Sequence, residues 1–195
     1  MRAEKRSDDV SAPSAPGWAD AEAVTIALRP IALDAQPTEY IREKWAGRPY
    51  GTVSEVRVAA AHNGQRLSVR LEWDDSATAN GEFPDAGAVY FPTGADAPVD
   101  TVGSADAPVR LWHWQADTAG AKNLEGRGPG RFRPVADTAL DATADLSDGK
   151  WSVVLTGEVT QAQSHRMGVV VWDGSNEERA GLGAVSAQWT QLEIG

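Results

Sequence analysis

Alternation of hydrophobic and polar residues with a period of two dominates the chain after its first residues. Over residues 67–73, Leu, Val, Leu and Trp alternate with Ser, Arg and Glu, which is the pattern of a half-buried strand. Val56, Val58 and Ala60 predict a second strand just upstream. Between them lies Asn63-Gly64, a dipeptide that accepts positive φ at both central positions of a type I′ turn. The sequence therefore predicts a β-hairpin.

Further short strands are expected along the rest of the chain, each bounded by Gly, Pro, Asp or Asn clusters that mark turns. These are residues 88–91, 109–114, 151–156, 168–172 and 188–194. Helical periodicity is almost absent, with one short turn of helix expected at 38–45 and another after Asp117. The predicted fold is all-β: an antiparallel immunoglobulin-like β-sandwich with few short helices.

The domain organisation follows from length and composition. With 195 residues, 42% of them hydrophobic, the chain is long enough for one domain with a substantial core and too short for two. Residues 1–16 are charged and then rich in Ser, Ala and Pro, so we expect a flexible N-terminal tail there. The single β-sandwich domain is expected to span residues 17–195.

Charge and cysteine content exclude several functions. The net charge is −10, so the chain lacks the phosphate-neutralising surface that nucleic-acid binding requires. Absence of cysteine excludes disulfides, thiolate metal sites and thioether-attached c-type haem. No apolar run is long enough for a transmembrane segment, and no signal peptide is recognisable. We expect a cytoplasmic protein, or one exported together with a partner that carries a signal.

Candidate catalytic and metal-binding groups each have a simpler interpretation. Asp74-Asp75 follows a predicted strand and is best interpreted as a solvated turn, because adjacent strand residues point to opposite faces. The acidic segment 173–178 lacks the ligand spacing of an EF-hand loop and is interpreted as a tight turn. His62, His113 and His165 have no metal-ligand spacing. With no nucleophile or nucleotide signature, the chain is expected to be non-catalytic and without a metal site.

The segment 109–115, Val-Arg-Leu-Trp-His-Trp-Gln, concentrates large rings on one predicted strand. Trp112 and Trp114 share one face because they are two residues apart, whereas His113 points to the other face. The two tryptophans are candidates for a pocket lining or a partner surface, and core packing is the simpler alternative. His113 cannot reach a ligand on the tryptophan face.

Five motifs stand in a characteristic order along the chain. They are the hairpin 56–73 with Asp74-Asp75, the segment 85–92 (DAGAVYFP), the segment 108–117 (PVRLWHWQAD), the segment 148–151 (DGKW), and 171–176 (VWDGSN) with Glu178-Arg179 and Ser186. Together they resemble the haem b-binding gamma subunit of the ethylbenzene dehydrogenase and dimethylsulfide dehydrogenase group of molybdenum enzymes (DMSO reductase family type II). The resemblance covers nearly the whole chain after the tail.

The resemblance implies a β-sandwich that holds one b-type haem beside an iron–sulfur subunit and a molybdopterin catalytic subunit. It also implies a methionine and a lysine as axial ligands, and their positions correspond to Val102 and Gly183 here. Neither residue can donate an electron pair to iron. Haem b is therefore one of two expectations, and His113, His165 and Met167 are the candidates to replace the missing ligands.

Three functions follow as hypotheses. The first is an accessory gamma-type subunit of a molybdopterin oxidoreductase complex that transfers electrons through b-type haem. The second is a haem-free structural subunit of such a complex. The third is a carbohydrate-binding β-sandwich module, in which Trp112 and Trp114 would stack on sugar rings.

Overall fold

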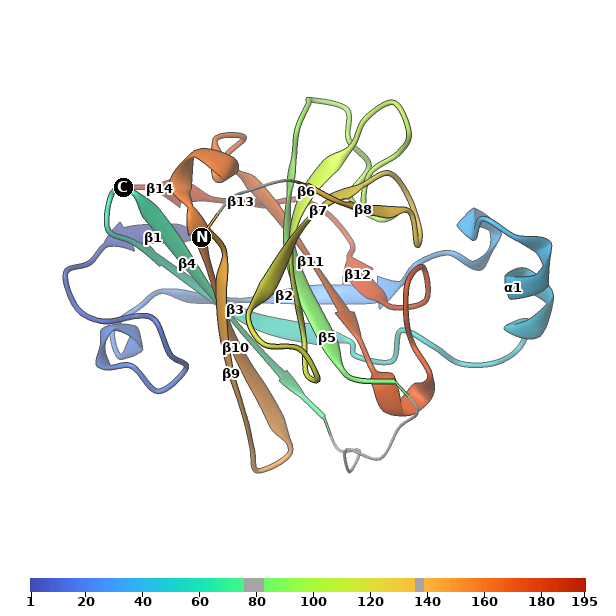
Figure 1. Cartoon of the computed structure of the whole chain (residues 1–195), viewed down its shortest axis with the longest axis horizontal. Coiled ribbons are helices and arrows are strands. Elements are labelled where there is room, and N and C mark those ends of the chain that lie inside the picture. Colours follow the sequence, from blue (N-terminus) through green and yellow to red (C-terminus); the bar gives the residue numbers. More distant parts are fainter. Residues whose placement is uncertain (76–82, 136–138) are drawn as a thin grey trace.

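The computed structural model describes residues 1–75, 83–135 and 139–195. Over these residues the chain forms a β-sandwich whose two layers belong to one continuous, almost entirely antiparallel sheet (Figure 1). The strand order is β8-β7-β6-β5-β11-β12-β2-β3-β4-β10-β9. The prediction of an all-β sandwich is confirmed.

The strands divide into two layers, and β2 passes from one to the other. The first layer consists of β1 (Arg2–Lys5), β2 (Ala23–Pro30), β3 (Glu55–His62), β4 (Arg66–Asp74), β9 (Asp141–Ser147) and β10 (Lys150–Glu158). The second layer consists of β5 (Ala86–Pro92), β6 (Val109–Gln115), β7 (Ala121–Gly126), β8 (Phe132–Pro134), β11 (Arg166–Trp172) and β12 (Ala184–Ser186). The first half of β2 pairs with β3, and its second half pairs with β12.

Short elements complete the fold. The strands β13 (Thr190–Gln191) and β14 (Glu193–Ile194) pair with β11 and β1, respectively. The helical elements are η1 (Pro16–Trp18), η2 (Leu33–Ala35), α1 (Glu39–Lys44), η3 (Val159–Ala162) and η4 (Gly174–Asn176). In Figure 1, α1 stands to one side of the sandwich, on the long connection between β2 and β3.

The main core lies between the two layers and follows the predicted alternation. From the first layer it receives Val56, Val58, Leu67, Val69, Leu71, Trp73, Val153 and Leu155, and from the second layer Val89, Phe91, Trp112, Trp114, Met167, Val169 and Val171. Trp112 is fully buried and Trp114 is 5% exposed. Both rings are thus part of the interior, where each indole removes a large apolar area from water.

The predicted hairpin is present, but its turn lies one residue later than expected. His62 pairs with Leu67, and the turn is closed by a hydrogen bond from Asn63 N to Arg66 O at 3.1 Å. Gly64 adopts the positive φ, while the Asn63 side chain accepts hydrogen bonds from the backbone N–H groups of Gln65 and Arg66. The asparagine therefore stabilises the turn with its side chain and not with its backbone conformation.

The predicted helix at 38–45 is also present. Thr38 caps α1 by accepting a hydrogen bond from Ile41 N. The short helix expected directly after Asp117 is absent, because the chain turns there and enters β7. The expected strand at 188–194 is divided into β13 and β14.

The first 16 residues differ from the flexible tail expected there. Arg2–Lys5 forms β1, which pairs in parallel with β3 and β14, and Ala3 is fully buried. Ala15 and Trp18 then pack on the outer face of the first layer, against Ala59, Ala61 and Val154. Backbone pairing of this kind leaves little trace in a polar sequence, because main-chain hydrogen bonds do not depend on side-chain type.

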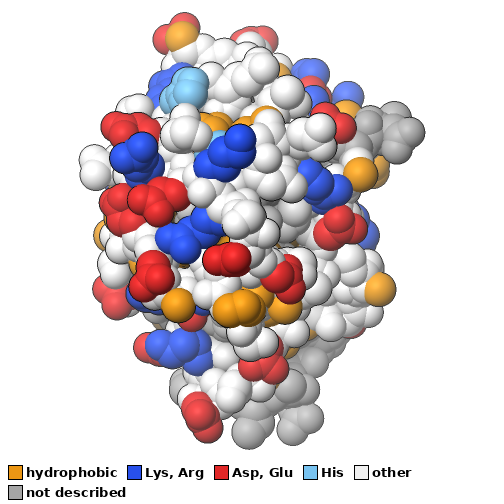
Figure 2. All heavy atoms as spheres, turned by 90° about the vertical axis from the view of Figure 1, so that its left-hand side faces the viewer, with side chains coloured by type: hydrophobic (Ala, Val, Ile, Leu, Met, Phe, Trp, Pro, Cys, Tyr) orange, Lys and Arg blue, Asp and Glu red, His pale blue; other side chains and the backbone are white. Residues whose placement is uncertain are grey.

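The surface carries charges of both signs. Figure 2 shows acidic and basic side chains interspersed with small apolar patches on the face it presents. Among the described residues, no helix is both long and apolar enough to cross a membrane.

Candidate functional site

A second apolar cluster lies on the outer face of the second layer, and loops cover it. We call it the covered cluster; its members are Ile31, Ala86, Ala88, Tyr90, Ala97, Val102, Val109, Leu111, Leu124, Val170, Trp172 and Val185. The loop 93–108 is tied down by hydrogen bonds from Tyr90 Oη to Val99 O at 2.7 Å and from Trp189 Nε1 to Ala97 O at 3.2 Å. Both positions that the family resemblance assigns to haem ligands border this cluster.

Val102 is fully buried in the covered cluster and contributes only methyl groups. Its φ is +56°, and the following Gly103 has a φ of +82°. A β-branched side chain rarely adopts this left-handed conformation, at a cost of about 1–3 kcal/mol. The backbone here is therefore poorly suited to the valine that occupies it.

Gly183 lies directly against the indole of Trp172. A Cβ atom at Gly183 would be 2.7 Å from Trp172 Cδ1, 2.8 Å from Trp172 Nε1 and 2.8 Å from Val171 O. The ring is held in place because Trp172 Nε1 donates a hydrogen bond to Ala180 O at 3.0 Å. No side chain fits at Gly183 without displacing this ring, and a lysine reaching into the cluster would meet it first.

His113 lines a cavity of about 260 Å³ on the same outer face, together with Phe83, Phe132, Trp172 and Arg179. The imidazole packs on the Trp172 ring, with 5.4 Å between ring centroids. Burial, and secondarily the charge of Lys122, lowers the pKa of His113 to about 4, so the ring is neutral at neutral pH. Its Nδ1 atom is buried and has no hydrogen-bond partner among the described residues.

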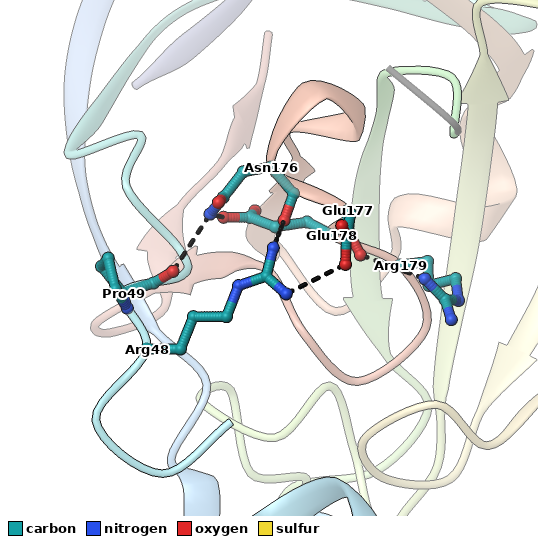
Figure 3. A network of polar contacts seen from close by, with 6 residues as sticks. All are labelled: Arg48, Pro49, Asn176, Glu177, Glu178 and Arg179. Carbon is teal, nitrogen blue, oxygen red and sulfur yellow. Dashed lines mark hydrogen bonds and ion pairs between the residues drawn. The ribbon is translucent and has the colours of Figure 1, made fainter. Parts of the chain in front are cut away.

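A polar network anchors the segment that leads to Gly183 (Figure 3). The buried carboxylate of Glu178 accepts hydrogen bonds from Gly51 N at 2.6 Å, Asp173 N at 3.1 Å and Asn176 Nδ2 at 3.1 Å. Burial raises the pKa of Glu178 above its usual value, and these three hydrogen bonds oppose that effect. The Arg48 guanidinium reaches from the loop after α1 to Glu177 at 2.9 Å and to Asn176 O at 3.4 Å. The predicted tight turn at 173–178 is thus a rigid junction between two loops.

The other candidate ligands lie apart from the covered cluster. Met167 is fully buried in the main core. His165 has a φ of +54° in the turn before β11, and its Nδ1 lies 3.3 Å from Leu192 O. Trp112 and Trp114 face the main core, whereas His113 faces the covered cluster, as the strand alternation predicts. The structure therefore brings together Val102, Gly183 and His113 around one cluster, and Met167, Trp112 and Trp114 in the other.

Asp74-Asp75 and the neighbouring Asp85 form an acidic group at the end of β4. Trp151 Nε1 donates to Asp75 Oδ2 at 3.0 Å and to Asp85 Oδ2 at 3.1 Å, and Gly174 N donates to Asp85 Oδ1 at 2.8 Å. Burial raises the pKa of Asp85 to about 6, and its hydrogen bond and charge interaction with Asp75 act in the same direction. Within residues 1–75, 83–135 and 139–195, no group of three or more His, Cys, Asp or Glu side chains could hold a metal ion.

Two residues that fill and anchor this site could not be singled out from the sequence. Trp172 was expected only as a strand residue, yet its ring fills the space beside Gly183. Glu178 was noted within a motif, and nothing in the sequence indicated that its carboxylate is 1% exposed. The Gly-x-Gly spacing at 181–183 was the available signal, because glycine permits close approach of a neighbouring ring.

These features define a β-sandwich protein with a second apolar cluster enclosed by loops, and no metal-binding group within the described part of the chain. By sequence, the chain belongs to the family described as ethylbenzene dehydrogenase, which matches residues 15–131. The family resemblance predicted from the motifs is confirmed.

Three curated relatives are similar over most of the chain. The chlorate reductase subunit gamma of Ideonella dechloratans is 35% identical over 74% of this chain and 67% of that subunit. A candidate respiratory nitrate reductase heme subunit (ORF7) of Haloferax mediterranei is 28% identical over 87% of this chain and 73% of that protein. The dimethylsulfide dehydrogenase subunit gamma of Rhodovulum sulfidophilum is 26% identical over 69% of this chain and 58% of that subunit.

Among solved structures, a family 9 carbohydrate-binding module of Caldicellulosiruptor kristjanssonii in complex with glucose is similar, with a TM-score of 0.59. The match covers 100% of this chain and 95% of that module at 9% sequence identity. This similarity shows the fold alone.

The residues of the covered cluster do not fit a haem bound in the family's manner. Of the two positions that the resemblance assigns to axial ligands, one is a buried valine and the other is a glycine against which an indole ring is packed. The cavity beside His113, about 260 Å³, lies below the roughly 300–1,000 Å³ of pockets that hold drug-sized ligands. The family positions in this chain form a packed apolar core.

Proposed function

We propose that this chain is a non-catalytic, gamma-type accessory subunit of a molybdopterin oxidoreductase complex, and that it serves there as a haem-free structural subunit. The observation that carries the proposal is the Trp172 ring packed on Gly183, in a chain that belongs to the ethylbenzene dehydrogenase family. Its partners would be an iron–sulfur subunit and a molybdopterin catalytic subunit, which would supply the substrate chemistry.

The relatives support the accessory role. Two of them are named as gamma subunits, one of a chlorate reductase and one of a dimethylsulfide dehydrogenase. The third carries the name of a heme subunit of a respiratory nitrate reductase. With Val102 and Gly183 at the two assigned ligand positions, the chain still forms the complete sandwich.

The strain at Val102 supports loss of the ligand. A φ of +56° is easier for an unbranched side chain than for valine, so the loop keeps a backbone that suits another residue. The neutral His113 has the chemistry of an iron ligand, because its Nδ1 is unpaired. The alternative to the proposal is therefore a subunit that transfers electrons through a haem held by His113. The experiment must distinguish this alternative from a haem-free subunit.

The test is purification of the tagged chain from its native host with its partners, followed by metal analysis and absorption spectra. The proposal expects molybdenum and iron–sulfur iron in stoichiometric amounts, with no b-type signal assigned to this chain in a pyridine haemochrome assay. Stoichiometric haem b on this chain would overturn the haem-free role. If haem is found, loss of its signal in a His113→Ala variant would identify the ligand.

Failure of the accessory role has a different signature. A chain that purifies without molybdenum or iron–sulfur partners and binds oligosaccharides would be a carbohydrate-binding module. Trp112 and Trp114 are enclosed in the main core, so their rings would not be the stacking surface for such a ligand.

A further inference from the structure

An open groove of about 560 Å³ lies at one end of the sandwich, where β5 ends and where β6 and β11 begin. Its walls come from the segment after β5, the start of β6, the residues of η3 and the start of β11. The side chains that matter for its chemistry are Arg110, Gln161 and Arg166. The groove is separate from the covered cluster and from the cavity beside His113, because it shares no lining residue with either.

The charge of the groove is opposite to that of the whole chain. The protein carries 28 acidic and 18 basic residues, but the described residues that line the groove include two arginines and no aspartate or glutamate. A concave surface with one sign of charge concentrates the field and attracts ions of the opposite sign. On this acidic protein, anions are therefore expected to approach the groove more readily than the surrounding acidic surface.

The guanidinium groups of the two arginines differ in how many contacts they make within the protein. Arg166 is braced: its Nη2 donates to Gly94 O at 3.3 Å and to Ala95 O at 3.2 Å, and its guanidinium lies 5.6 Å from the centre of the Trp189 ring. Arg110 is half-buried, and no described residue forms a hydrogen bond or ion pair with its guanidinium. One arginine is thus fixed in place, and the other has its full set of donors available for a ligand.

Gln161 adds an unpaired buried donor. Its Oε1 accepts a hydrogen bond from Trp112 Nε1 at 2.8 Å. An indole N–H only donates, so this bond fixes which end of the amide is the oxygen. The other end, Nε2, is buried and has no partner among the described residues. A buried donor without an acceptor is unfavourable, so this amide is held by its bond to Trp112 alone.

We propose that this groove binds a carboxylate-bearing anion, with Arg110 and Arg166 pairing with its charges and with Gln161 as a neutral polar part of the wall. Guanidinium groups pair with planar carboxylates through two parallel hydrogen bonds, and the groove has room for a ligand larger than a single inorganic ion. The carboxylates can belong to a small di- or tricarboxylate or to the acidic side chains of a polypeptide. The inference does not depend on the proposed function, because it rests on the groove alone.

The experiment is titration of the full chain with three probes: citrate, a hexapeptide of glutamate and inorganic phosphate, each at low and at high salt. We expect citrate or the peptide to bind, with weaker binding at high salt. The probe that binds more tightly distinguishes a small-molecule source from a polypeptide source. Absence of binding by both carboxylate probes, or binding of phosphate alone, would overturn the proposal.

Two variants and a matched control assign the binding to the groove. Arg110→Gln should weaken binding at least about tenfold, as expected for one lost charge-assisted pair. Gln161→Glu keeps an acceptor for Trp112 Nε1 but replaces the donor by a negative oxygen, so it should weaken binding and do so more at pH 7 than at pH 4. Arg133→Gln removes the same charge from an exposed site outside the groove and should leave binding unchanged.

Equal loss of affinity in Arg133→Gln and Arg110→Gln would mean that only net charge matters, and the site would be disproved. Unchanged thermal unfolding of each variant shows that the fold is intact. If Gln161→Glu fails to fold, Arg110→Gln still decides the question.

Discussion

The Trp172 indole lies directly against Gly183, with its Cδ1 and Nε1 atoms in the space that any side chain at Gly183 would enter. A Cβ atom there would be 2.7 Å from Trp172 Cδ1, well inside the normal contact distance. The tryptophan is 2% exposed, and its N–H is bonded to Ala180 O. A lysine at residue 183 and the present packing of the Trp172 ring are thus mutually exclusive.

Restoring the two ligand types alone should not restore haem. In the double variant Val102→Met with Gly183→Lys, we expect no Soret band after reconstitution with haemin, because Trp172 still fills the space beside residue 183. Adding Trp172→Ala removes the ring but not the backbone contact with Val171 O, so we expect the triple variant to bind haemin more strongly than the double variant but with a Soret band below full intensity. A Soret band of full intensity in the double variant would contradict the interpretation of the ring as the obstacle.

A smaller change tests the same contact through stability. Gly183→Ala should lower the free energy of unfolding by about 2 kcal/mol or more, because one of the close neighbours is the backbone oxygen Val171 O, which cannot move aside freely. The control is Gly94→Ala, where a Cβ atom would have no neighbour within 4 Å. Chemical denaturation of both variants measures the difference, and equal effects would show that the contact is relieved at little cost.

Glu178 should be a major determinant of stability. Glu178→Ala leaves the N–H groups of Gly51 and Asp173 and the amide of Asn176 without their acceptor, which is expected to cost about 3 kcal/mol or more. Glu177→Gln is the matched control, since the Glu177 side chain is in contact with solvent and a solvent-screened ion pair such as its pair with Arg48 contributes little to stability. Urea unfolding of the two variants gives the comparison. A loss of less than 1 kcal/mol for Glu178→Ala would show that water replaces the carboxylate.

Stability should depend on the protonation of Asp85. Its folded pKa is about 6 against an ordinary value of 3.8, so between these values the folded state holds a proton that the unfolded state has lost. The free energy of unfolding therefore falls as the pH rises from about 4 to 6, and this contribution is absent above that range. Because the carboxyl is only about half buried, solvent screening limits the contribution to about 1 kcal/mol.

Asp85→Asn removes the titrating group: its amide oxygen can accept from Gly174 N, its amide nitrogen can donate to Asp75, and Trp151 Nε1 keeps Asp75 Oδ2 as its acceptor. The slope of stability against pH between 4 and 6 should be flatter in the variant than in the native chain. Asp96→Asn, at an exposed position, should keep the native slope. Equal slopes in Asp85→Asn and the native chain would assign the pH dependence to other groups.

The strands with clear alternation could be predicted from the sequence, whereas short strands and contacts between loops could not. Val109–Gln115 and Lys150–Glu158 were expected within a residue or two, because one face of each strand must be apolar to form the main core. Phe132–Pro134 and Ala184–Ser186 are too short to carry a period and depend on their neighbours for pairing. The assignment of Val102 and Gly183 as ligand positions stays a prediction from motif order, whereas the ring beside Gly183 depends on how two distant segments meet, which no local pattern encodes.

The N-terminal segment provides the last prediction. Trp18 is 3% exposed, its indole N–H bonds to Ala12 O at 3.0 Å, and the Arg70 guanidinium lies 5.1 Å from the centre of its ring. Removal of residues 1–16 would delete β1 and the acceptor of that indole, and would uncover apolar side chains on the outer face of the first layer. We expect the truncated chain to lose about 2 kcal/mol or more of stability in urea unfolding, and Trp18→Ala in the full chain to lose about 3 kcal/mol. An unchanged midpoint for the truncated chain would mean that the segment is a free tail after all, while a large loss in Trp18→Ala alone would limit the packing role to the residues after Pro16.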